Sequence, residues 1–225
     1  MKRIQTPLLL ILLTALLGGC IPVIPWIEAV FAPDKVVPPE YDVPRDARML
    51  VLVTDVQLAD IATAARLKRE LTKQINIQML HYNVVYDVVA YEDIQNLIAT
   101  DRNFYDMMPG EIAAKLDADL VLHVRIDQFA LKDSEYSTLW SGRLKSRIRL
   151  LSLDDDLLWP KDRPTGLAMP ETKEVTYRDT TETYGVQMTE TLAKNAATDI
   201  VKCFREYTVP QNIHERPAPV MDTDF

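Results

Sequence analysis

The sequence predicts an α/β (α+β) domain, in which helices pack against one mixed β-sheet. Three observations predict it. The short apolar run at 49–55 is typical of a buried strand. The segment 57–80 carries apolar residues at helical spacing. The segment 139–153 alternates between apolar and basic residues, as a half-exposed strand does. Helices and strands alternate early and strands follow one another later, which favours a mixed sheet.

The elements are expected in the order β-α-β-α-α-β-β-β-α. The segment 83–91 is rich in β-branched and aromatic residues, which favour strands, and Pro109 stands where proline favours the first turn of a helix. Residues 154–170 are rich in turn-forming residues. The predicted elements are strand 49–55, helix 57–80, strand 83–91, helix 92–100, a helix from Pro109, strands 118–131, 139–153 and 172–179, and helix 186–206.

The first residues read as a targeting signal. Lys2 and Arg3 precede an apolar stretch, Leu8–Leu17, of roughly ten residues. That length suits a secretory signal and is about half of what a membrane-spanning helix needs. The stretch ends in Leu17-Gly18-Gly19-Cys20.

These four residues resemble the lipobox of bacterial lipoproteins. The resemblance implies cleavage before Cys20 and a covalent lipid on Cys20. No motif in the sequence calls for a cofactor. Residue 21 is Ile rather than Asp, which by the enterobacterial sorting rule implies the outer membrane and a domain facing the periplasm. The alternatives are an ordinary signal peptide with an incidental cysteine, or an uncleaved anchor.

Four regions are expected: a lipoprotein signal peptide at 1–19, a proline-rich tether at 20–47, one domain at 48–207 and a tail at 208–225. The tether holds six prolines, which favour extended chain. Its apolar start, at 23–31, is unusual for a spacer; it either contacts a membrane or partner or packs on its own domain. Of the 225 residues, removal of 1–19 leaves 206, and loss of Lys2 and Arg3 takes the net charge from −8 to −10.

This composition excludes several functions. The acidic balance argues against nucleic-acid binding, which needs a basic surface. Cys203 is interpreted as a buried apolar residue and not a reactive thiol, and Cys and His show no metal-ligand spacing. His123 lies in an apolar strand, which favours a packing role over catalysis. Asp154–Asp156 suggests calcium, but a solvated turn is the simpler interpretation. An enzyme is therefore not expected.

One charge pattern has a functional interpretation. On the strand at 139–153, four cations alternate with apolar residues and so share one face: Arg143, Lys145, Arg147 and Arg149. The simpler interpretation is cross-strand pairing with acids such as Asp127, Asp133 or Glu174. The functional one is a docking face for an acidic partner or an anionic envelope polymer.

The order of elements and several local phrases resemble a group of envelope proteins: the curli-export lipoprotein CsgG, the amino-terminal domain of TolB, and the lipoprotein activators of penicillin-binding proteins. Three segments stand at the same places in the order of elements as in this group: "MLVLVTD", "YDVVAYEDIQNLI" and "LKSRIRLLSLDDDLLWP". A fourth segment, "EIAAKLDADLVLHVRI", is the best match. The resemblance spans about 48–205. The chain departs from the group at three places. Asp117 replaces the usual Gly, and His123-Val124 replaces the Gly after the strand. The turn before Trp159 lacks the usual Thr-Gly.

The leading function hypothesis is a lipid-anchored, non-catalytic interaction or assembly module of the periplasm, with an envelope protein partner or self-association. The alternative is a subunit of an oligomeric export or secretion complex, which the resemblance to the curli-export lipoprotein implies. Membrane-spanning hairpins are not favoured, because 132–141 is short and polar and 154–174 contains three prolines. An envelope hydrolase would need a nucleophile or metal site that no motif supplies.

Overall fold

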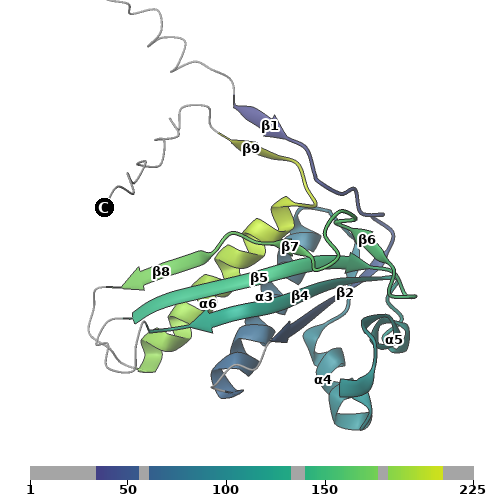
Figure 1. Cartoon of the computed structure of the whole chain (residues 1–225), viewed down its shortest axis with the longest axis horizontal. Helices are drawn as coiled ribbons and strands as arrows, with labels where there is room; N and C mark the ends of the chain where they lie inside the picture. The colour runs from purple at the N-terminus through teal and green to yellow at the C-terminus, as the bar shows by residue number, and fades with distance from the viewer. Residues whose placement is uncertain (1–33, 56–60, 133–139, 177–181, 210–225) are drawn as a thin grey trace, which may run out of the picture. The chain divides into compact units, whose positions relative to one another are not determined.

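The computed structural model describes residues 34–55, 61–132, 140–176 and 182–209 (Figure 1). They divide into two compact units, one formed by 38–206 and the other by 34–37 with 207–209. In the smaller unit, β1 (Lys35–Val37) pairs antiparallel with β9 (Tyr207–Val209). None of the described helices is long and apolar enough to cross a bilayer.

The larger unit is built on a seven-stranded mixed sheet whose main path is β3-β2-β4-β5-β6. β2 (Arg48–Asp55) runs parallel to β3 (Asp87–Val88) and to β4 (Leu120–Ala130). β5 (Trp140–Leu151) is antiparallel to β4 and also pairs with the short strands β6 (Leu157–Trp159), β7 (Leu167–Ala168) and β8 (Thr172–Thr176). The long β4–β5 pair forms the centre of the sheet (Figure 1).

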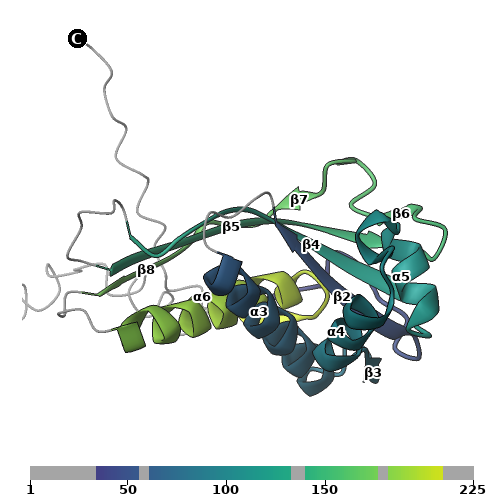
Figure 2. The same ribbon diagram turned by 90° about the horizontal axis from the view of Figure 1, so that it is seen from below.

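Two long helices cover one face of the sheet. α3 (Ile61–His81) and α6 (Glu182–Lys202) contact each other beneath the long strands (Figure 2). Their apolar residues repeat every three to four positions, which puts them on one stripe. The stripe packs on alternate residues of the strands. This core includes Leu71 and Ile75 of α3, Ala197 and Ile200 of α6, and Val51, Val124 and Ile148 of the sheet.

Shorter helices cover only one end of the opposite face. They are α4 (Tyr91–Thr100), the 3₁₀ turn η1 (Phe104–Asp106) and α5 (Pro109–Lys115). Ile94, Phe104 and Ile112 of these elements pack on Leu50 and Val121 of the sheet. α4 and α5 lie at the end of the sheet where β6 also lies (Figure 2). The rest of this face carries polar side chains.

The predicted fold class and order of elements are confirmed, with additional short strands at 35–37, 157–159, 167–168 and 207–209. The main difference lies at 83–91, where a strand was expected and only Asp87–Val88 is one. Asn83 has a φ of 53° and turns the chain at the end of α3. Val84 and Val85 are buried in the core as part of this loop, so apolar residues can fill a core without forming a strand.

The segment 38–47, expected as part of the tether, belongs to the larger unit. Val43 and Ala47 belong to its core. The amides of Glu40 and Tyr41 donate to the carbonyl oxygen of Cys203, at 2.8 and 3.3 Å. That carbonyl lies just beyond α6, where a helix leaves acceptors without partners. The apolar stretch 23–31 lies outside the described residues.

Candidate functional site

The predicted cations of β5 lie together on the face of the sheet opposite α3 and α6. Leu144, Ile148 and Leu150 alternate with them and are buried on the other face, as the sequence pattern predicts. Neighbouring strands add Arg125 and Lys173 to the group. We call this surface the cationic face; its described residues are Arg125, Arg143, Lys145, Arg147, Arg149 and Lys173, with the acids Asp127 and Glu171.

Each acid on the cationic face is shared by two cations. Asp127 Oδ1 accepts from Nε of Arg125 at 3.1 Å, and its Oδ2 forms an ion pair with Nε of Arg147 at 2.8 Å. Glu171 lies 3.0 Å from Nζ of Lys173 and 3.9 Å from Nζ of Lys145. The hydrogen bond from Lys173, with the charge of Lys145, holds the pKa of the Glu171 carboxyl below its usual range. Among the described residues the face therefore keeps an excess of positive charge.

The pairing partly matches the cross-strand pairs expected from the sequence. Asp127 pairs with a cation of β5, as expected. The partner of Lys145 is Glu171, whereas Glu174 lies opposite Gly142 and belongs to the other face. Asp133 lies outside the described residues.

The register places like charges directly opposite each other. Arg125 faces Arg147 across the β4–β5 ladder, and Arg143 faces Lys173 across β5–β8. Like charges in directly opposite positions of an antiparallel pair destabilise it. Shared carboxylates offset part of this repulsion.

His123 is a structural residue of this face. It is 8 % exposed and bonds both to Arg149 of β5 and to Thr54 of β2, at 2.8 and 2.9 Å. Burial, followed by the charges of Arg149 and Arg125, lowers the pKa of His123 from 6.5 to about 4. The ring is thus neutral near pH 7 and holds the Arg149 side chain in place.

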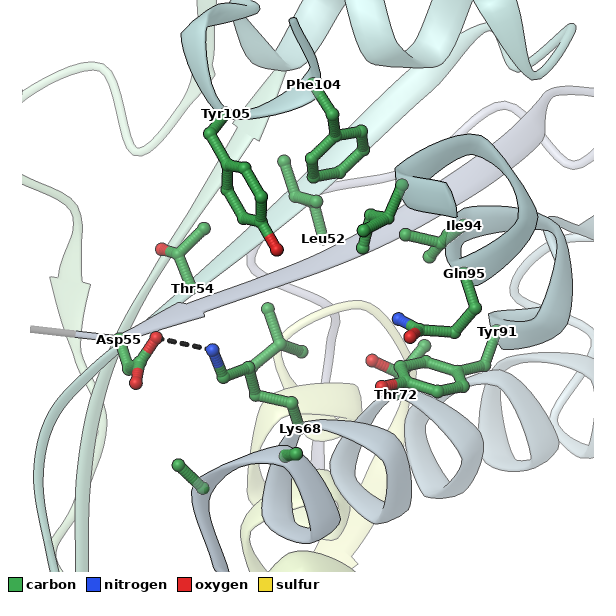
Figure 3. A pocket seen from close by; sticks show the side chains of 14 residues that line it. Leu52, Thr54, Asp55, Lys68, Thr72, Tyr91, Ile94, Gln95, Phe104 and Tyr105 are labelled. Carbon is green, nitrogen blue, oxygen red and sulfur yellow. Dashed lines mark hydrogen bonds and ion pairs between the residues drawn. The ribbon is translucent and has the colours of Figure 1, made fainter. Parts of the chain in front are cut away.

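A second feature is a groove beside β2, which the sequence did not indicate. Its volume is about 590 Å³. The second half of β2 forms its floor, α3 forms one wall, and α4 with η1 forms the other. Figure 3 shows Phe104 and Tyr105 on one side of β2 and Lys68 and Thr72 of α3 on the other. Lys68 Nζ lies 2.6 Å from Oδ1 of Asp55 at the end of the strand.

The groove exists because β3 is short. β3 pairs with β2 only at Arg48 and Met49, and the chain then turns away into α4. Beyond that point the edge of β2 has no strand beside it among the described residues. No local sequence pattern signals this gap, because it depends on where a strand distant in sequence ends.

The aspartates at 154–156 form a turn that holds α5. The Ser152 hydroxyl accepts from the amides of Asp154 and Asp156, at 3.2 and 3.1 Å. Asp155 has a φ of 61° and its Oδ1 accepts from the Gly110 amide at 2.9 Å. The carboxylate thus binds the first turn of α5, where backbone amides lack partners. No group of three metal-binding side chains is present in the described part of the chain.

Of the two cysteines, Cys203 lies within the described residues. Cys20 lies outside the described residues, so its lipidation stays a prediction. Cys203 is free and buried. Burial, with smaller contributions from Glu40 and Asp199, raises the pKa of its thiol to about 12. This agrees with its interpretation as an apolar core residue.

Comparison with known proteins gives matches in structure alone. No family model matches the sequence, and no curated protein matches it. The lipoprotein GNA1162 from Neisseria meningitidis is 12 % identical, covers 68 % of this chain and 99 % of its own, and has a TM-score of 0.42. The PelC dodecamer from Paraburkholderia phytofirmans is 8 % identical, with coverage of 77 % and 99 % and a TM-score of 0.39. The LpoB C-terminal domain from Salmonella enterica is 12 % identical, with coverage of 60 % and 86 % and a TM-score of 0.30.

Of these three structures, GNA1162 is named as a lipoprotein. A specific relationship to CsgG or TolB stays a prediction from the sequence.

Proposed function

We propose that this chain is a lipid-anchored, non-catalytic interaction module of the bacterial envelope, which docks an acidic protein partner through its cationic face. The observation that carries the proposal is the register of like charges on that face. Arg125 lies opposite Arg147, and Arg143 lies opposite Lys173, so cations of three strands gather on one face of a chain whose net charge is −8. An acidic surface docked on this face would complement that charge.

The geometry of the cationic face suits an extended acidic surface. Cations two residues apart on one strand are spaced by about 7 Å, so the four of β5 form a row of about 20 Å. The side chains of Arg125, Lys145 and Arg147 keep 37 to 48 % of their surface exposed. They can therefore reach a partner while their shared carboxylates orient them.

The side chains best suited to acid–base or nucleophilic catalysis have structural roles instead, which supports a non-catalytic module. His123 is held between Thr54 and Arg149, and Cys203 is a buried thiol with a pKa of about 12. The lipobox residues at 17–20 supply the proposed anchor, which would present the domain at the outer membrane facing the periplasm.

The test is crosslinking in cells with the full-length chain, followed by detergent extraction and mass spectrometry. The variant Arg143→Glu/Arg147→Glu reverses two cations of the face. Arg66→Glu/Lys194→Glu makes the same charge change at two exposed helical positions on α3 and α6. We expect the first pair to reduce crosslinks to a distinct envelope protein by about tenfold and the second to leave them unchanged.

Equal crosslinking by both double variants would contradict docking through the cationic face. A ladder of self-crosslinks, without a distinct partner, would favour the alternative of a subunit in an oligomeric export or secretion complex. Thermal melting of each variant establishes that it is folded, which matters because Arg147→Glu places a carboxylate beside Asp127.

A further inference from the structure

The edge of β2 offers backbone groups to the groove. Met49 O accepts from the Val89 amide on the β3 side, at 2.9 Å, whereas Arg48 O accepts from the Asp119 amide on the β4 side, at 2.8 Å. In a parallel ladder, successive residues direct their amide and carbonyl to opposite neighbours. The β2–β4 register is unbroken from Met49 to Asp55, so the amide and carbonyl of Val53 point away from β4 and into the groove.

The accessible part of this edge is short. Val51 is completely buried, whereas Leu52 is slightly exposed and residues 53–55 are half-buried. The groove is accordingly lined by Leu52–Asp55 and not by the residues before them. An added strand would therefore pair with about three or four residues of β2 and continue along the line where β3 ends.

The two walls of the groove lie where the side chains of an added strand would point. Successive side chains of a strand point to opposite sides of the sheet. One set would contact Ala65 and Lys68 of α3, and the other would contact Ile94 of α4 and Tyr105 of η1 (Figure 3). Tyr105 is 82 % exposed. Such exposed tyrosines are common at the centres of binding sites, because they bury a large ring and keep a polar end.

Charge complementarity defines the occupant. Of the residues that line the groove, only Asp55 and Lys68 are charged, and these two pair with each other at 2.6 Å. A lining without net charge gives no compensation to a buried charge, so the occupant has to be uncharged where it contacts the groove. This is the opposite of what the cationic face requires, and the two surfaces would bind different ligands.

We infer that the groove binds a short, extended and uncharged peptide segment of a partner protein, which adds to the sheet as a strand beside β2. Strand addition supplies partners for the Val53 amide and carbonyl, and an exposed strand edge is a ready template for such pairing. The volume of about 590 Å³ lies within the usual range for binding pockets. This site goes beyond the proposed function, because it involves another surface and another chemistry.

The probes are four neutral pentapeptides, acetyl-Ser-X-Thr-X-Ser-amide, in which X is Val, Ile, Phe or Tyr. Each is added to the full-length chain in detergent, and amide hydrogen exchange of the segment 50–55 is followed by mass spectrometry. We expect at least one peptide to bind with a Kd of about 1 mM or tighter and to slow exchange in this segment. The same peptide with both X residues N-methylated should bind about tenfold more weakly, because it cannot donate to the strand edge.

Two matched variants test whether the peptide binds in the groove. Ala65→Trp fills the groove from an exposed position of α3, and Ala99→Trp makes the same change at an exposed position of α4 outside the groove. We expect Ala65→Trp to abolish the slowed exchange and Ala99→Trp to preserve it. The inference is overturned if no peptide binds, if N-methylation has no effect, or if both variants behave alike. The inference is also overturned if a higher protein concentration, without any peptide, slows amide exchange of the segment 50–55. The occupant of the groove would then be a second copy of the chain.

Discussion

Arg149 Nη2 lies 2.8 Å from Nδ1 of His123, and this contact determines which tautomer the histidine adopts. A guanidinium can only donate, so Nδ1 accepts and the ring proton resides on Nε2. Nε2 then donates to the hydroxyl oxygen of Thr54 at 2.9 Å. One neutral imidazole thus links β2, β4 and β5. A second ring proton would remove the acceptor that Arg149 uses.

The first prediction is a loss of stability at mildly acidic pH that His123 causes. The pKa of His123 is about 4 in the folded chain and 6.5 as its reference value. Between these values the unfolded chain binds more protons, so the free energy of unfolding decreases as pH falls from about 6.5 to about 4. At 1.4 kcal/mol per pKa unit, the full loss is about 3 kcal/mol. Urea unfolding at pH 7 and at pH 4.5 measures it.

His123→Gln is the control for this effect. A glutamine can accept from Arg149 and donate to Thr54, and it does not titrate. All other ionisable groups are shared, so the difference between the two pH profiles isolates His123. Identical pH dependence in the two chains would show that His123 is not protonated preferentially in the unfolded state.

The second prediction concerns Gly110 in the first turn of α5. A Cβ at this position would overlap the carbonyl oxygen of Leu153 and approach the carboxylate of Asp155. The clash is with backbone, which cannot move as a side chain can. We expect Gly110→Ala to lower the free energy of unfolding by about 2 to 3 kcal/mol, as overpacking does. Urea denaturation provides the measurement.

Ala114→Gly is the converse change at an exposed position of the same helix. It should cost only about 1 kcal/mol, because glycine is the weaker helix former. Helix propensity alone would make Gly110→Ala stabilising. A gain in stability from Gly110→Ala would therefore contradict the close contact between α5 and the turn at 152–156.

Local periodicity made much of this fold predictable. Alternation along β5 separates buried Leu144 and Ile148 from Arg147 without knowledge of any neighbour. The apolar spacing of α3 and α6 likewise indicates which side faces the sheet. At 83–91 the strand predicted from β-branched and aromatic composition was wrong except at Asp87–Val88, because Val84 and Val85 are buried in a loop that follows a turn at Asn83. Strand-favouring residues can be buried without forming a strand.

The candidate sites were predictable to different degrees. The row of cations on β5 follows from one strand, but the shared acids Asp127 and Glu171 depend on register between strands. The groove beside β2 depends on where β3 ends and on the placement of α4 and η1, and Tyr105 in the sequence resembles any surface tyrosine. The bond from Gly110 to Asp155 joins residues 45 positions apart. Such long-range contacts cannot be predicted from local sequence patterns.

The third prediction is that Cys203 is unreactive in the folded chain. Its thiol is buried and its pKa is about 12, mainly because of burial. Since the thiolate is the reactive form, a maleimide at pH 7 should label Cys203 at least about 100-fold more slowly in buffer than in urea. The Cys20→Ser chain makes Cys203 the sole thiol for this measurement. Equal rates in the two solvents would contradict its burial.

The fourth prediction concerns membrane attachment through Cys20. Acyl chains bind a bilayer with roughly 0.8 kcal/mol per buried CH₂, so several chains on one residue attach a domain stably. Cys20→Ser removes the acceptor, and we expect the chain to move from the membrane to the soluble fraction after a carbonate wash, with its free energy of unfolding unchanged. Cys203→Ser is the matched control and should stay with the membrane. If Cys20→Ser also stays, the apolar stretch at 8–17 is acting as an uncleaved anchor, and the lipoprotein interpretation is wrong.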